Sequence, residues 1–149
     1  MNFLQYHNVL RWFVVVFGIW AVLNALGGLL SKREYSRSDN MSSLLFMISC
    51  DLQLLLGLIL FVSNGWFAKI KAGMGEVMKN PVDRFFTVEH AFVMILAWIL
   101  VHIGRSSVKR AGTDLAKHKR MLIYYGIAIV LILISIPWPF RAEAGRPWL

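Results

Sequence analysis

The residues best suited to chemistry in this 149-residue chain are ionisable side chains that fall inside long apolar stretches. His7 and Arg11 stand near the start of the first stretch, Glu89 and His90 near the start of the third, and Asp51 in the middle of the second. Ionisable groups are costly at membrane depth, so by default they mark a functional site or a structural pairing. The sequence therefore directs attention to how these five side chains meet.

The first apolar stretch places a histidine and an arginine on one face of the helix that it predicts. At about 100° per residue, six positions fall within an arc of about 80°: His7, Arg11, Val14, Gly18, Ala21 and Ala25. Small residues let helices approach closely, so this face should point into a bundle. The tryptophans on the other side, Trp12 and Trp20, are expected to meet lipid.

His7 and His90 lie toward the same end of two different apolar stretches, and three interpretations of the pair stay open. Imidazoles from facing helices can be the axial ligands of a b-type haem, with Arg11 meeting a propionate. Alternatively, both histidines are structural and bond to Glu89 or to backbone. The third interpretation is another metal or a quinone. Because Glu89 lies at a depth close to that of Arg11, we also predict a buried ion pair between these two residues.

The remaining polar groups are weaker candidates. Asp51 is either a proton-relay group or a neutral acid hydrogen-bonded to Asn24, which lies at a similar depth; the neutral form is favoured because desolvation raises a carboxyl pKa. His102 lies about 18 Å further along its stretch than His90, a distance that suits a second cofactor but places the ring on a different side. His118, within Lys-His-Lys-Arg, is expected to be solvated at the membrane surface.

The elements that must position these residues are four apolar helices. Hydrophobic residues make up 58% of the chain and charged residues 16%, which excludes a disordered chain and disfavours a soluble globule. We predict one all-α domain over residues 1–149, an antiparallel up-down four-helix membrane bundle with spans at about 8–30, 43–63, 85–105 and 114–137. Thr113 is the expected N-cap of the fourth helix. A short interfacial helix should lie between the second and third spans, weakened by Gly73 and Gly75.

Charge and cysteine content limit the partners and the location. The formal charge is +8, but the basic residues flank apolar spans and no recognised motif accompanies them, so nucleic acid is not an expected partner. The single Cys50 excludes a disulfide framework. Two of the connections carry nine Lys and Arg, against six in the remaining connection and the tail. This excess predicts a bacterial inner-membrane protein with both termini in the periplasm.

The chain also resembles a family of small four-span membrane proteins of Bacteroidetes that are often labelled "cytochrome B". The resemblance covers most of the chain and rests on seven segments: His7-Asn-Val-Leu-Arg11-Trp12, Leu52-Gln53-Leu54-Leu55-Leu56-Gly57, Val88-Glu89-His90, Ile103-Gly104-Arg105-Ser106, Thr113-Asp114, Lys117-His118-Lys119 and Ile136-Pro137-Trp138. In that family the position of Asp51 is often a histidine, so this chain lacks one ligand for a second haem.

These observations together predict a membrane-embedded protein with one b-type haem, held by His7 and His90. It would be an electron carrier or a subunit of an oxidoreductase rather than a stand-alone enzyme. A partner complex or a homo-oligomer is expected, and a quinone is a candidate partner. The competing hypothesis is a haem-free accessory subunit that uses the same polar groups to lock helices inside a larger inner-membrane assembly.

Overall fold

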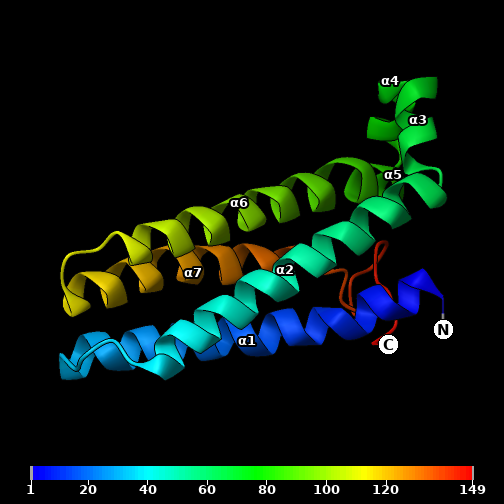
Figure 1. The fold of residues 1–149 in the computed structure, drawn as a ribbon. Helices are drawn as coiled ribbons and strands as arrows, with labels where there is room; N and C mark the ends of the chain where they lie inside the picture. The colour runs from blue at the N-terminus through cyan, green and yellow to red at the C-terminus, as the bar shows by residue number, and fades with distance from the viewer. Residues whose placement is uncertain (1, 149) are drawn as a thin grey trace.

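Four long helices dominate the computed structural model, which describes residues 2–148 (Figure 1). They are α1 (Phe3–Ser31), α2 (Arg37–Ser63), α6 (His90–Lys109) and α7 (Asp114–Ser135). Between α2 and α6 the chain forms three short helices and one π-helical turn: α3 (Trp66–Ala72), α4 (Met74–Lys79), α5 (Pro81–Arg84) and η1 (Phe85–Glu89). No strand occurs among residues 2–148, so the all-helical fold class is confirmed.

Each of the four long segments is apolar and long enough to cross a membrane. The first two begin five or six residues earlier than the sequence pattern indicated, and the third is helical from Pro81 to Lys109. Large apolar side chains are exposed along the outer faces of all four, including Phe13, Leu55, Phe92 and Ile127. Such a surface matches hydrocarbon rather than water.

The long helices lie side by side, and each packs against two others. Helix α1 packs on α2 and α7, and α6 packs on α7 and, less extensively, on α2. The α1–α2 and α6–α7 connections lie at one end in Figure 1, whereas both termini and α3–α5 lie at the opposite end. We call these the loop end and the terminal end.

The small-residue face of α1 is buried as the sequence predicted. Arg11, Val14, Gly18, Ala21 and Ala25 are all buried, and a Cβ on Gly18 would lie 2.6 Å from Ile129 of α7 and 2.8 Å from Phe46 of α2. Close approach of backbones at small residues is how membrane helices pack. The face therefore sets the contact of α1 with both of its neighbours.

Side chains cap the helix starts. Thr113 accepts a hydrogen bond from the Ala116 amide at 3.1 Å, which confirms the predicted N-cap. Asn2 and Ser36 cap α1 and α2. The predicted interfacial helix is instead two short helices that meet at Gly73, the glycine expected to weaken it.

Candidate functional site

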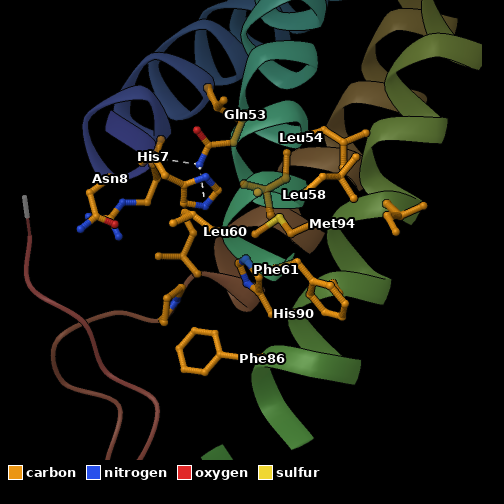
Figure 2. A pocket seen from close by; sticks show the side chains of 18 of the residues that line it. His7, Asn8, Gln53, Leu54, Leu58, Leu60, Phe61, Phe86, His90 and Met94 are labelled. Atoms are coloured by element: carbon orange, nitrogen blue, oxygen red, sulfur yellow. Dashed lines mark hydrogen bonds between the residues drawn. The ribbon is translucent and has the colours of Figure 1, made fainter. Parts of the chain in front are cut away.

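A cavity of about 470 Å³ opens at the terminal end, between the four long helices and the turn before α6. His7 from α1 and His90 from α6 both line it, and Figure 2 shows them with Gln53, Phe61 and Phe86 around the same space. The walls are mainly apolar, and the volume lies within the ~300–1,000 Å³ typical of cofactor sites. The two histidines singled out from sequence thus line one cavity.

His90 is held in one orientation by a backbone carbonyl. Its Nδ1 lies 2.8 Å from the carbonyl oxygen of Ser135 in α7, so Nδ1 carries the proton and donates, which leaves the lone pair on Nε2. Histidines that bind metals are oriented in this way, through a hydrogen bond of the second ring nitrogen. The π-helical turn η1 ends at Glu89, directly before His90, and such turns are frequent at functional sites.

His7 is held by Gln53 of α2. Gln53 Nε2 donates to the His7 carbonyl at 3.1 Å and lies 3.2 Å from His7 Nε2. His7 Nδ1 and Gln53 Oε1 are buried with no hydrogen-bond partner among the described residues. The ring lies over Gly57 of α2, where a Cβ would be 3.4 Å from His7 Cε1, an ordinary van der Waals contact.

Arg11 lines the cavity but does not pair with Glu89, so the predicted ion pair is wrong. Its Nη2 donates to the Trp148 carbonyl at 2.7 Å, and its guanidinium lies 5.5 Å from the ring centre of Trp12. Glu89 is exposed and accepts from Arg84 at 2.9 Å. Arg11 and Glu89 therefore each have a separate hydrogen-bond partner.

Trp12 is half-buried against the C-terminal tail, rather than meeting lipid with its whole ring as expected. Its ring centre lies 6.0 Å from that of Trp138 and 6.1 Å from that of Trp148. The tail therefore folds back over the start of α1, where Arg146 also lines the cavity. The buried Arg11 Nε has no partner among residues 2–148, so two guanidinium groups stand at the cavity with hydrogen-bonding capacity to spare.

Asp51 bonds to two residues of α6 and not to Asn24. Trp98 Nε1 donates to Asp51 Oδ1 at 2.6 Å, and His102 Nε2 lies 2.7 Å from the same oxygen. Asn24 instead donates to Ser38 and Ser42 near the loop end. The predicted Asp51–Asn24 bond is therefore wrong, and His102 belongs to the Asp51 cluster.

His118 is fully buried at the loop end, which corrects the expectation of a solvated ring. It packs on Gly28 of α1 and lies 3.1 Å, at Nε2, from the Arg33 carbonyl. Arg33 forms a bidentate ion pair with the buried Asp39. The hydrogen bonds of this pair raise the pKa of the Arg33 guanidinium. Burial raises the pKa of neighbouring Tyr35 to about 12.

Sequence reasoning did not assign roles to Gln53, Trp98 or the Ser135 carbonyl. Gln53 had a visible signal, because it is one of three polar residues that interrupt the second apolar stretch. Trp98 had no such signal, because a tryptophan inside an apolar span is most simply interpreted as a packing residue. Among the described residues, no group of three or more His, Cys, Asp and Glu is placed to hold a bare metal ion.

Comparison with known proteins does not place the chain in a family. No family model, no curated protein and no solved structure matches it. The geometry of the cavity therefore carries the functional argument.

Proposed function

We propose that this chain is a membrane-embedded electron-transfer protein that binds one b-type haem in the cavity at the terminal end. The observation that carries the proposal is that imidazoles from two different helices, His7 and His90, line one largely apolar cavity. The two imidazoles would hold the iron of a haem, because the macrocycle supplies the other four nitrogen ligands.

Each residue has a role that follows from its contacts. His90, fixed through Nδ1 by Ser135, offers Nε2 as the better-oriented ligand. His7 becomes available when Gln53 gives up its contact with the ring and keeps its bond to the His7 carbonyl. Arg11 and Arg146 are suited to bind the propionates. The bound haem supplies one-electron redox chemistry, and the apolar walls exclude water from it.

The wider proposal follows from the chain's shape and charge. The connections group at one end and the termini at the other, which supports an antiparallel up-down bundle. The Lys and Arg distribution supports a bacterial inner-membrane location with both termini in the periplasm. Little of the chain lies outside the four spans, so the electrons would be exchanged with a partner subunit, a second copy or a quinone within the membrane.

A haem-free accessory subunit is the second candidate, and one observation favours it. The two histidines also tie helices together, since His7 contacts α2 through Gln53 and His90 contacts α7 through Ser135. Purely structural histidines would make the same bonds. The two functions differ in whether the purified protein carries haem.

The experiment is a reduced-minus-oxidised spectrum with a pyridine haemochrome assay on protein expressed with ample haem. Wild type should contain about one haem per chain, and His7→Ala and His90→Ala should lose it. His118→Ala is the matched control, because it removes a buried imidazole from the opposite end of the same bundle. A colourless wild type would leave the accessory-subunit function standing.

A further inference from the structure

The Asp51–His102 pair lies on the outer face of the seam between α2 and α6. The two side chains are 41% and 36% exposed, although both belong to apolar spans. Trp98 and His102 both reach the same carboxylate oxygen, Oδ1. Oδ2 has no hydrogen-bond partner among residues 2–148, and the Asp51 side chain that carries it is partly exposed.

The depth of Asp51 makes an unpartnered oxygen costly. Asp51 is 14 residues from the start of α2 and 12 from its end, which is about 21 and 18 Å along the helix axis. The carboxylate thus lies near the bilayer centre, far from water and from lipid headgroups. Hydrocarbon neither donates nor accepts a hydrogen bond, so Oδ2 requires a polar partner that comes from within the bilayer.

The surroundings favour a flat aromatic donor. The Trp98 and His102 rings lie 4.5 Å apart, centre to centre. Exposed apolar side chains that do not line the cavity border the pair at one helical turn: Ile48, Leu55 and Ile99. A lipid-soluble molecule with a ring hydroxyl would place its hydroxyl on Oδ2 and its ring on this apolar rim. Sterols and diacylglycerols carry their hydroxyl at the membrane surface, too shallow for Asp51.

We propose that Asp51 and His102 form a bilayer-facing binding site for a membrane quinol, with Asp51 Oδ2 accepting a hydrogen bond from a ring hydroxyl. Trp98 lines the haem cavity and also donates to Asp51, so a single side chain connects the two places. Quinol binding at Asp51 goes beyond the proposed haem function. It rests on that function only where the bound quinol is taken to donate electrons to the haem.

The test is photolabelling of the full chain in phosphatidylcholine nanodiscs with a diazirine-tagged decylubiquinol, kept reduced and competed by untagged decylubiquinol. Wild type should show saturable, competed labelling at Ile48, Leu52, Leu55, Ile99 or His102, none of which lines the haem cavity. Asp51→Asn should lower that labelling roughly tenfold, as expected when a charge-assisted hydrogen bond is lost. Asp83→Asn is the matched control, because Asp83 pairs with Lys69 outside the seam. His102→Gln supplies a second variant if Asp51→Asn does not fold.

Several outcomes would overturn the proposal. Labelling that is not competed, that maps to the haem cavity, or that persists in Asp51→Asn excludes a quinol at this pair. A wild-type dimer that dissociates on Asp51→Asn substitution and takes no label would show that a second copy covers the pair instead. The spectrum of the same preparations separates the two proposals: colourless protein with competed labelling overturns only the haem, and coloured protein without it overturns only the quinol site.

Discussion

Replacing Gly28 with alanine should destabilise the loop end of the bundle. A Cβ at position 28 would overlap the His118 ring at Cε1, Nδ1 and Nε2. The ring has little room to retreat, because His118 is fully buried, contacts the Arg33 carbonyl at 3.1 Å and lies 5.6 Å from the Tyr35 ring. The added methyl group must therefore push α1 away from α7 or displace the histidine.

The magnitude follows from these two routes. Overpacking a tight contact costs ~1–3 kcal/mol, and leaving a buried hydrogen-bonding group unpaired costs ~1–3 kcal/mol. Because the protein takes the cheaper route, we expect a loss of about 1–3 kcal/mol, which corresponds to a fall of roughly 2–12 °C in Tm for a chain of this size. Gly27→Ala is the matched control, because a Cβ at position 27 meets nothing within 4 Å. Alanine favours a helix over glycine by ~1 kcal/mol, so this variant should be neutral or slightly stabilised.

The assay is thermal unfolding in detergent followed by a maleimide dye that becomes fluorescent on thiol reaction. Cys50 is the single cysteine and is buried, so the signal reports opening of the bundle. His118→Ala combined with Gly28→Ala should be less destabilised than the sum of the single changes, because the methyl group then has space. A Gly28→Ala protein that unfolds at the wild-type temperature would refute the packing argument.

Two further predictions concern the loop end. Cysteines placed at Ser36 and at Ser107 on a Cys50-free background should be shielded from an impermeant thiol reagent in whole cells; labelling of either would reverse the proposed orientation. Tyr35, whose pKa is about 12 because of burial, should ionise in the folded protein well above the ordinary value of about 10. Since the folded state holds this proton more tightly, Tyr35 costs stability as pH rises above about 10. Absorbance titration at alkaline pH should lose the step near pH 12 in Tyr35→Phe and keep it in Tyr6→Phe.

Local sequence patterns predicted the helices and one packing face. Apolar length identified all four long helices, Thr113 was identified as a cap, and the arc that contains Gly18 and Ala21 is buried. These features depend on spacing within one helix, which a sequence states directly. Placing His7 and His90 at the same end required one more step, namely that short connections make successive helices reverse direction.

The polar partners could not be predicted, because they depend on rotation and on competing nearby groups. Similar depth in the membrane suggested that Arg11 pairs with Glu89 and that Asp51 bonds to Asn24. Depth alone does not determine the direction in which a side chain points around its helix axis. Arg84 lies five residues from Glu89 and satisfies it at the surface. The carbonyl that holds Arg11 comes from Trp148, 137 residues away, in a tail with no periodic pattern to place it.

The two ends of the bundle differ in what their side chains do: the loop end contributes helix packing, and the terminal end holds the cavity. At the loop end, the His118 ring packs on Gly28, and Arg33 pairs with the buried Asp39. At the terminal end, the helices leave a cavity that His7 and His90 line. Buried polar atoms without a partner occur at both ends, among them His118 Nδ1 and His7 Nδ1, so the cavity itself distinguishes the terminal end as the place for a ligand. Gly28→Ala should accordingly lower Tm while leaving the absorption spectrum of any bound haem unchanged, because the distortion lies at the opposite end from His7.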